Sequence, residues 1–436
     1  MKRQTVHRGL LWSGALLALP LAAVLRNPLL LQWRAFATPL LAVLAIAALL
    51  MVDRQWRSSR QRLTQHSILF GLWLSALALV AAQEGVFHWR KHQVRQSAAA
   101  EAQALGAHII IGYSHPEEVR VLAQKGLVAG IFIGANTVSG RTAEAIAAEI
   151  AGLQLLRKTA GLRPLIVSTD QEGGIVSRMS PPLVQTPPLA DIIAGAKLED
   201  VEILAFTYGQ EHGRGLAALG VNVNFAPLAD LSFPRARNRL DFHSLIGQRA
   251  IAADPHRVST AVIGYAHGLE AHGVRGTLKH FPGLGRVSAD THLFRAALSA
   301  SESALEKSDW IPFREGLRDT QSLLMVGHAT LSAVDAHNPA SLSRKVVQGI
   351  VRDRWGHEGV LVTDDMAMAP VVRHGMCKAG VDAINAGMDL LLVSYDTDQY
   401  YTIMHCLLQA RRDGTLQDKP LRASGLRLQH ALGSGV

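Results

Sequence analysis

The first hundred residues contain three apolar stretches, at about 9–25, 36–52 and 68–84, with basic residues in the segments around them. Each stretch is roughly 17 residues long, near the lower limit for a helix that crosses a lipid bilayer. The first stretch follows a basic start, as in a signal peptide, but no small-residue cleavage site follows it and two more stretches do. We therefore expect three transmembrane helices in an N-terminal anchor and connector that covers residues 1–104.

The basic residues around these stretches predict an orientation. Lys2, Arg3 and Arg8 precede the first stretch, and Arg54, Arg57, Arg60 and Arg62 lie between the second and the third. The positive-inside rule places both groups in the cytoplasm, so an odd number of spans puts the rest of the chain outside. The cluster of Arg90, Lys91 and Arg95 after the third stretch argues against this orientation, and two spans would leave the rest in the cytoplasm. We expect a multi-pass protein of the cytoplasmic membrane with an extracytoplasmic main body.

From about residue 105 the pattern changes to short apolar, β-branched runs that alternate with longer amphipathic or alanine-rich segments. Such continuous runs are typical of buried parallel strands. They lie at 108–113, 128–134, 164–170, 221–230, 276–283, 323–330, 359–365 and 390–394. Eight strands alternating with helices over roughly 330 residues predict an α/β fold, a (β/α)8 TIM-type barrel, in a second domain at 105–436. A doubly wound open sheet is the alternative, although no G-x-G-x-x-G follows the first strand.

Charge and cysteine content narrow the function classes. The net charge is +9, but residues 1–105 hold twelve of the 44 basic and three of the 35 acidic residues, so the remainder carries 32 of each. The main body therefore has no basic excess that would indicate nucleic-acid binding. The two cysteines, Cys377 and Cys406, are too far apart for a C-x-x-C site. We expect two free buried thiols, with one disulfide as the alternative.

Polar residues end five of the eight predicted strands. The carboxyl ends of barrel strands meet at one mouth, where barrel enzymes hold their active sites. The residues at these ends are Asp170, Asp230, Lys279 with His280, His328 and Asp364. Their convergence predicts an active site at this mouth.

Two hydrolytic chemistries fit such a set of residues. His280, His328 and Asp364 could hold a zinc ion for metal-assisted hydrolysis. Glycoside hydrolysis instead needs a carboxylate on one side of the anomeric carbon and a proton donor on the other. Asp364 is the candidate nucleophile, preferred over Asp365 because strand alternation puts it on the same side as Val360 and Val362.

The candidate proton donor lies in the loop "KHFPGLGRVSADTH" at 279–292. A hydrogen bond from the ring of His292 to Asp290 would fix the tautomer and favour the imidazolium, which is a competent general acid near neutral pH. If His292 did not serve as the acid, Glu172 and Asp230 would be the next candidates.

Several ordered motifs resemble one enzyme family. "DQEGGIVSRM", "NFAPLADL", "IGQRAIAADP", "KHFPGLGRVSADTH" and "NPASLSRKVVQGIVRDRWGHEGVLVTDDMAM" occur in this order. From about residue 106, three quarters of the chain resembles the bacterial β-N-acetylhexosaminidase branch of glycoside hydrolase family 3. The loop matches that branch's K-H-F-P-G-H-G-x(4)-D-S-H with identical spacing.

The resemblance implies a retaining exo-β-N-acetylglucosaminidase that removes terminal non-reducing N-acetylglucosamine from peptidoglycan fragments, without a cofactor or metal. It implies a covalent intermediate on Asp364, with His292 as acid/base oriented by Asp290. The residues implied to hold sugar hydroxyls are Asp170, Arg249, Lys279 and His280. The expected partners are a carbohydrate substrate and the inner membrane of a bacterium, with no nucleic acid, and the oligomeric state is left open.

The sequence departs from the family pattern beside the predicted site. Leu284 replaces the usual His of P-G-H-G, Ile175 replaces an Arg after E-G-G, and Ala250 and Ile251 replace Ser-Phe. The membrane anchor is a further departure, since the cytoplasmic members lack one. The Leu284 and Ile175 changes keep one alternative open, a catalytically impaired, membrane-tethered glycan-binding protein. A metal-dependent barrel hydrolase that uses His280, His328 and Asp364 is the other alternative.

Overall fold

The computed structural model describes all residues except 1, 59–62, 234–244, 288–295 and 434–436. The chain divides into two compact units, Met1–Gln96 and Ser97–Val436.

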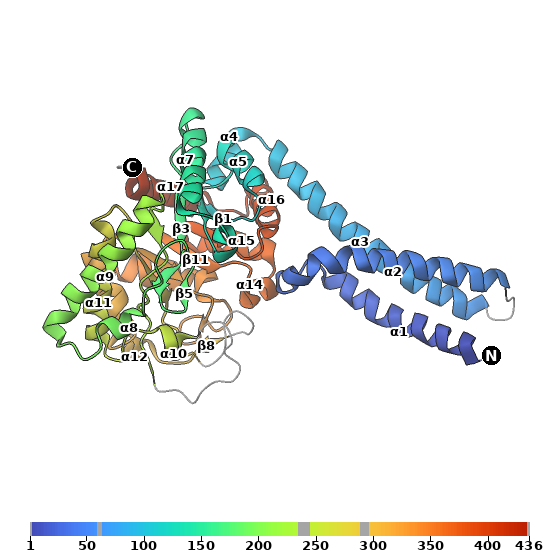
Figure 1. The fold of residues 1–436 in the computed structure, drawn as a ribbon, viewed down its shortest axis with the longest axis horizontal. Helices are drawn as coiled ribbons and strands as arrows, with labels where there is room; N and C mark the ends of the chain where they lie inside the picture. The colour runs from blue at the N-terminus through green and yellow to red at the C-terminus, as the bar shows by residue number, and fades with distance from the viewer. Residues whose placement is uncertain (1, 59–62, 234–244, 288–295, 434–436) are drawn as a thin grey trace. The chain divides into compact units, whose positions relative to one another are not determined.

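The first unit is helical (Figure 1). Its elements are α1 (Lys2–Val24), the short 3-10 helix η1 (Pro28–Leu30), α2 (Leu31–Ser58) and α3 (Leu63–Gln96). Both α1 and α2 pack against α3. Among the described residues, Pro28–Arg57 and Thr64–Gln96 are long and apolar enough to cross a membrane, whereas the apolar helical part of the first predicted span, Gly9–Val24, is shorter.

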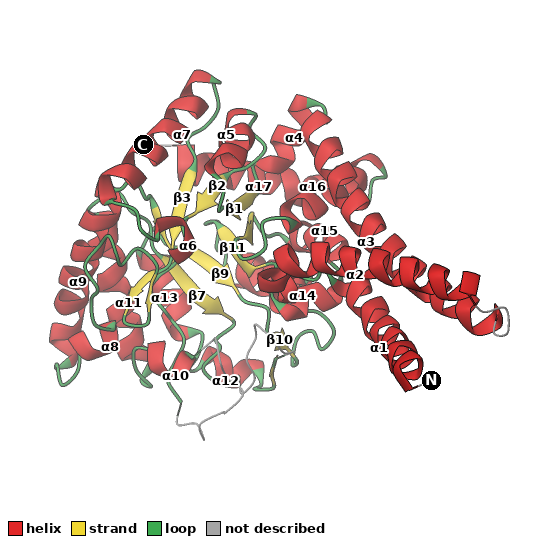
Figure 2. Ribbon diagram, turned by 45° about the vertical axis from the view of Figure 1, so that its right-hand side comes forward, coloured by secondary structure: helices red, strands yellow, loops and turns green. Residues whose placement is uncertain are grey.

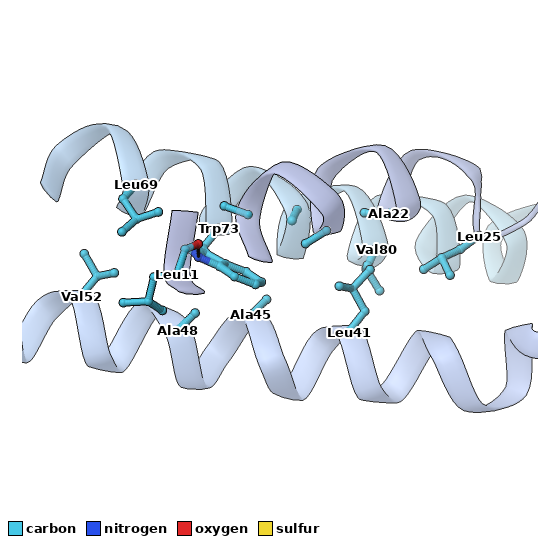
Figure 3. Close-up of a cluster of buried hydrophobic side chains, with 13 residues drawn as sticks. Leu11, Ala22, Leu25, Leu41, Ala45, Ala48, Val52, Leu69, Trp73 and Val80 are labelled. Atoms are coloured by element: carbon cyan, nitrogen blue, oxygen red, sulfur yellow. Dashed lines mark hydrogen bonds between the residues drawn. The ribbon is translucent and has the colours of Figure 1, made fainter. Parts of the chain in front are cut away.

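Small and large apolar side chains are distributed unusually in this unit. Alanines of all three helices, together with Leu11 and Trp73, make up much of the buried contact between the helices (Figure 3). Large apolar side chains point outward instead: Leu17 is 73% exposed and Trp33 is 67% exposed. A water-soluble bundle buries its large apolar residues, so the outer surface of this unit is of the kind that contacts an apolar environment.

Polar contacts tie the end of α1 to α3. The guanidinium of Arg26 forms an ion pair with Glu84, in which Nε lies 3.0 Å from Oε1. Gln83 donates to the carbonyl of Ala22 at 2.6 Å. Arg34 donates to three carbonyl oxygens of the segment 25–27, at 3.3 to 3.4 Å. Arg26 and Arg34 therefore both have acceptors within the unit.

The second unit is an α/β barrel with eight parallel strands at its centre (Figure 2). The strands are β1 (Ile109–Gly112), β2 (Gly130–Phe132), β3 (Ile166–Thr169), β6 (Val223–Asn224), β7 (Thr277–Phe281), β9 (Leu323–Val326), β11 (Leu361–Asp365) and β12 (Leu390–Val393). Their order is β6-β3-β2-β1-β12-β11-β9-β7. Each of the eight runs expected from the sequence contains one of these strands, so the prediction of a parallel α/β barrel is confirmed.

The barrel is nearly closed between β6 and β7. Two isolated parallel bridges, Val223–Arg275 and Leu228–Lys279, cross this seam. The backbone N–H of Asn224 donates to the carbonyl of Arg275 at 2.8 Å, and that of Ala229 donates to Lys279 at 2.8 Å. The second bridge places Lys279 directly beside the segment that leads to Asp230.

Helices surround the strands, and short elements fill the connections between them. The longer helices are α4 (Ala99–Gly106), α5 (Pro116–Gln124), α7 (Ala143–Thr159), α9 (Leu198–Ala218), α11 (Pro255–Glu270), α13 (Ile311–Asp319), the π-helix η4 (Lys345–Arg354), α15 (Met376–Ala386), α16 (Gln399–Arg412) and α17 (Asp418–Gly433). The shorter elements are α6 (Ala135–Val138), β4 (Gln171–Gly173), β5 (Val176–Ser177), α8 (Leu189–Ile192), α10 (Ile246–Arg249), β8 (Ala297–Leu298), α12 (Glu302–Glu306), β10 (Thr330–Leu331), η3 (Ala340–Leu342) and α14 (Ala369–His374).

Helices α9 and α11 approach each other closely because both carry glycines four residues apart. A Cβ atom on Gly209 would lie 2.2 Å from the carbonyl oxygen of Tyr265, and one on Gly268 would lie 2.2 Å from that of Phe206. Side chains at these positions would force the helices apart. The close contact brings side chains of α9 and α11 together behind β4, the segment that carries Glu172.

The barrel interior is filled by apolar side chains from alternate strand positions. Val360 and Val362 at β11 and Leu390 and Leu392 on β12 belong to one buried cluster. Val362 pairs with Leu390 and Asp365 with Leu392, so the register shifts between them and interrupts the alternation before Asp364. The parity argument for Asp364 therefore stays a prediction.

Cys377 on α15 and Cys406 on α16 form a disulfide, with their Cα atoms 5.3 Å apart. The expectation of two free thiols is therefore wrong. The two helices pack side by side, so cysteines 29 residues apart in the sequence become neighbours.

Candidate active site

Lys279 connects the ends of two strands at the mouth of the barrel. It lies on β7 and is 2% exposed. Its Nζ atom lies 2.6 Å from Oδ1 of Asp170, which follows β3, and 2.6 Å from Oε1 of Glu172 on β4. Two residues implied to bind sugar, Asp170 and Lys279, are thus in direct contact.

Glu172 also binds Arg249, the last residue of α10. Arg249 donates to Glu172 from Nε at 3.0 Å and from Nη2 at 2.6 Å, in the forked geometry that suits a carboxylate. Burial by itself would raise the pKa of Glu172, but the charges of Arg249 and Lys279 outweigh it and lower the pKa to about 2. Burial works against the Arg249 cation, but the Glu172 carboxylate outweighs it and holds the pKa of Arg249 above its usual range. An ionised Glu172 cannot act as a general acid near neutral pH.

His280 is held by a buried carboxylate. Asp230 is fully buried and accepts from Nδ1 of His280 at 2.8 Å and from its backbone N–H at 3.1 Å. It also accepts from the backbone N–H of Leu284 at 2.6 Å. These three bonds fix the ring of His280 and the start of the loop that follows β7.

The end of β11 holds two adjacent carboxylates with different surroundings. Asp365 accepts from the backbone N–H groups of Ala367, Ser394 and Tyr395 at 2.7 to 2.8 Å and from the hydroxyl of Ser394. Its carboxylate thereby joins β11 to the segment after β12. Asp364 accepts from the backbone N–H of Asp365 at 2.8 Å. Asp365 is therefore occupied by structural hydrogen bonds.

Comparisons with known proteins identify the family of this chain. Residues 93–431 match the model for the glycosyl hydrolase family 3 N terminal domain. The chain belongs to this family. It is 35% identical to a β-hexosaminidase of Xylella fastidiosa (strain M23) over 276 residues, which cover 62% of this chain and 78% of that protein. By this homology it is a glycoside hydrolase of the β-hexosaminidase type.

Solved structures of the family agree. The chain is similar to a glycoside hydrolase family 3 β-N-acetylglucosaminidase from Paenibacillus sp. str. FPU-7, with a TM-score of 0.70 and 28% identity, covering 77% of this chain and 63% of that chain. It is also similar to the β-N-acetylhexosaminidase from Beutenbergia cavernae DSM 12333, with a TM-score of 0.68 and 26% identity, covering 76% of this chain and 98% of that chain. This chain thus spans less than two thirds of the Paenibacillus protein and nearly all of the Beutenbergia one.

His328 follows β9, and both of its ring nitrogens form hydrogen bonds. Nδ1 lies 2.7 Å from the hydroxyl of Ser341, and Nε2 lies 3.0 Å from the carbonyl oxygen of Asp365. Burial lowers the pKa of His328. Within the described residues, no group of three His, Cys, Asp or Glu side chains could hold a metal ion.

The pair implied to be the acid/base, Asp290 and His292, lies outside the described residues. The described part of the loop ends at Val287, whose backbone N–H donates to the carbonyl of Leu284 at 3.0 Å.

Two of the departures from the family pattern lie side by side. Ile175 and Ile251 line the same small hollow as Glu172 and Arg249. Leu284 is 3% exposed, so the side chain that replaces the family's usual histidine is packed inside the protein. The polar cluster at the mouth therefore has an apolar wall on one side.

The sequence predicts Glu172 only as a substitute acid, whereas the structure places it between two cationic side chains. Its position as the partner of both Arg249 and Lys279 depends on contacts across 77 and 107 residues of sequence. The one local signal was its place in D-Q-E-G-G directly after a strand. Gly173 has a φ of 88°, and a Cβ there would lie 1.9 Å from the hydroxyl of Tyr208, so this turn requires glycine.

Proposed function

We propose that the chain is a retaining exo-β-N-acetylglucosaminidase that removes terminal non-reducing β-linked N-acetylglucosamine from peptidoglycan fragments. The observation that carries the proposal is the buried cluster of Asp170, Glu172, Arg249 and Lys279 at the mouth that also holds Asp364. A sugar offers several hydroxyls close together, and fixed charged donors and acceptors at strand ends suit such a polyol.

In the proposed mechanism, Asp364 attacks the anomeric carbon and the bond to the leaving oxygen breaks. His292 gives its proton to that oxygen, and a covalent glycosyl-enzyme ester remains on Asp364. In the second step, His292 takes a proton from water, which attacks the same carbon and releases the sugar. Asp290 would orient the ring of His292 through both steps.

Four residues are proposed to hold the sugar. Lys279 and Arg249 can donate to hydroxyl oxygens, and Asp170 can accept from hydroxyl groups. His280 presents its ring with Nδ1 already bound by Asp230. Glu172 keeps both cations in place before the substrate arrives, so their side chains lose little conformational entropy when the sugar binds.

We also propose that the first unit is a three-helix membrane anchor. Its alanine-lined interior and apolar exterior support this, as do the exposed tryptophans near both ends of α2. Trp33 and Trp56 are about 35 Å apart along the helix axis, close to the thickness of a bilayer with its interfaces. Helix α1 is 23 residues long as a whole, although its apolar part is shorter.

The proposed orientation places the barrel outside the cytoplasm. The four arginines at 54–62 lie between α2 and α3 or at the end of α2. At the opposite end of the bundle, Arg26 is paired with Glu84, and Arg34 is bound to carbonyls. The positive-inside rule therefore favours cytoplasmic exposure of the 54–62 end. The disulfide between Cys377 and Cys406 supports an oxidising compartment for the barrel.

A hydrolysis panel tests the proposed activity. The detergent-solubilised full chain is given an aryl β-N-acetylglucosaminide, the matching aryl β-glucoside and a disaccharide muropeptide. We expect turnover of the first and third and little of the second. No turnover with retained binding of N-acetylglucosamine would instead indicate the glycan-binding alternative.

A further inference from the structure

A chain of buried polar groups lies behind Glu172. Nδ1 of His212 on α9 lies 2.7 Å from the hydroxyl of Tyr265 on α11. Nε2 of His212 lies 2.8 Å from the hydroxyl of Thr186, which lies 2.9 Å from that of Tyr208. The Tyr208 hydroxyl donates to the carbonyl of Pro187. His212 therefore joins α9, α11 and the segment that precedes α8.

These hydrogen-bonded side chains contact the backbone that carries Glu172. The hydroxyl of Tyr265 lies 3.1 Å from the carbonyl oxygen of Gln171 and accepts from Nδ2 of Asn224 at 3.0 Å. Asn224 also binds both backbone groups of Gln171, at 2.8 and 2.9 Å. The Tyr208 hydroxyl lies 3.4 Å from the carbonyl oxygen of Glu172. The backbone of Gln171 and Glu172 is thus held by Asn224, Tyr208 and Tyr265. The Glu172 carboxylate binds the cations of Arg249 and Lys279.

In either tautomer, the ring of His212 bridges the hydroxyl groups of Tyr265 and Thr186. With the proton on Nε2, the ring donates to Thr186, whose hydroxyl donates to Tyr208. Nδ1 then accepts the hydroxyl proton of Tyr265. With the proton on Nδ1, the ring donates to Tyr265, whose hydroxyl donates to the carbonyl of Gln171, and Nε2 accepts from Thr186.

Only a neutral imidazole fits this place. His212 is 3% exposed, and burial lowers the pKa of its ring to about 4. A neutral ring accepts at one edge and donates at the other, which bridges two hydroxyl groups. An apolar side chain of similar size would leave the hydroxyls of Tyr265 and Thr186 without this partner, and unsatisfied buried polar groups are costly.

We propose that His212 is a positioning residue for sugar binding: through Tyr265 and Thr186 it fixes the Gln171–Glu172 backbone and thereby the places of Arg249 and Lys279. The inference rests on the proposed function, because it assumes that these two cations hold the terminal sugar. His212 itself contacts neither the sugar nor the reacting atoms.

The test compares His212→Leu and His212→Gln with matched changes at another buried histidine. His108 is the control: it is also 3% exposed, lies just before β1, and bonds the carbonyl of Asp389 at 2.9 Å and the hydroxyl of Ser424 at 3.2 Å. For the full chain in detergent, KM and kcat for an aryl N-acetylglucosaminide are measured together with Tm.

We expect His212→Leu to raise KM about tenfold with a smaller change in kcat, because the cations contact the sugar in both the ground and the transition state. His212→Gln keeps one acceptor and one donor and should bring KM back to within about threefold of the wild type. His108→Leu should lower Tm and leave KM unchanged.

Two results would overturn the inference. One is a KM for His212→Leu within twofold of the wild-type value. The other is an equal rise in KM for His108→Leu, which would make the effect one of general stability. Wild-type protein without turnover would refute the proposed function instead, and the Kd for N-acetylglucosamine measured by calorimetry would then replace KM in the same comparison.

Discussion

The carboxylate of Glu172 and the guanidinium of Arg249 are joined by two hydrogen bonds, of 3.0 and 2.6 Å, across 77 residues of sequence. Their side chains are 7% and 8% exposed, so water cannot replace either partner. Removing one member of such a pair leaves an uncompensated buried charge. Loss of either partner should therefore destabilise the barrel and disorder its mouth.

Glu172→Gln should lower the free energy of unfolding by about 3–5 kcal/mol at pH 7 and raise KM, because Arg249 and Lys279 lose their shared anion. The lowered pKa of Glu172, about 2, gives a contribution that is complete above the unfolded pKa of roughly 4.3. This contribution is lost as pH falls toward 2. The free energy of unfolding in urea should therefore fall less between pH 7 and pH 3 for the variant than for the wild type.

The control for this prediction is Glu302→Gln. Glu302 pairs with Arg354 at 2.8 Å, but both side chains are more exposed, at 34% and 48%. Its loss should cost less than about 1 kcal/mol. An equal decrease in the free energy of unfolding for Glu172→Gln and Glu302→Gln would contradict the role given to Glu172.

Asp364→Asn should remove nearly all turnover and leave Tm close to the wild-type value, because the amide cannot form the covalent ester. A 2-deoxy-2-fluoro glycoside should label wild-type Asp364, as mass spectrometry of the digested protein would detect. Asp365→Asn is the matched change, and it should lower Tm because Asp365 accepts four hydrogen bonds. A label on any other residue would count against Asp364.

His292→Ala should slow hydrolysis far less with a dinitrophenyl N-acetylglucosaminide than with a disaccharide, because a good leaving group needs little protonation. The covalent intermediate should accumulate, and azide should partly restore its breakdown. Asp290→Asn should give a milder form of this pattern. Equal losses on both substrates without an azide effect would make His292 structural.

A phosphatase fused to the C-terminus should be active in cells, and a reporter that works only in the cytoplasm should be silent. This outcome follows from three spans with the 54–62 arginines inside. The reverse result would indicate two spans, or an orientation set by Arg90, Lys91 and Arg95.

Cys377 and Cys406 should resist alkylation in denatured wild-type protein until a reductant is added. Changing both to serine should lower the free energy of unfolding by about 3–4 kcal/mol, as expected when a cross-link closes a loop of this size. Alkylation of both thiols without a reductant would show that they are not joined in cells.

The sequence by itself determined the eight strands of the barrel and the mouth at which their polar ends meet. Runs such as "LLMV" on β9 and "LLLV" on β12 are apolar throughout because parallel strands in a barrel are covered on both faces. Strand ends must return to water, so the polar residues after each run could be placed without knowing which strands are neighbours. The three apolar stretches of the first unit could also be found from the sequence, because composition along the chain is a local property.

Only the tertiary structure decided which of these residues touch. The ion pairs of Glu172, the disulfide between α15 and α16, and the bond from His212 to Tyr265 each join segments 29 or more residues apart. Apart from the place of Glu172 in D-Q-E-G-G directly after a strand, nothing in the local pattern distinguishes it from a solvated acid, or His212 from an exposed histidine. Their state depends on burial and on partners, and both arise only when α9, α11 and β7 pack around β4.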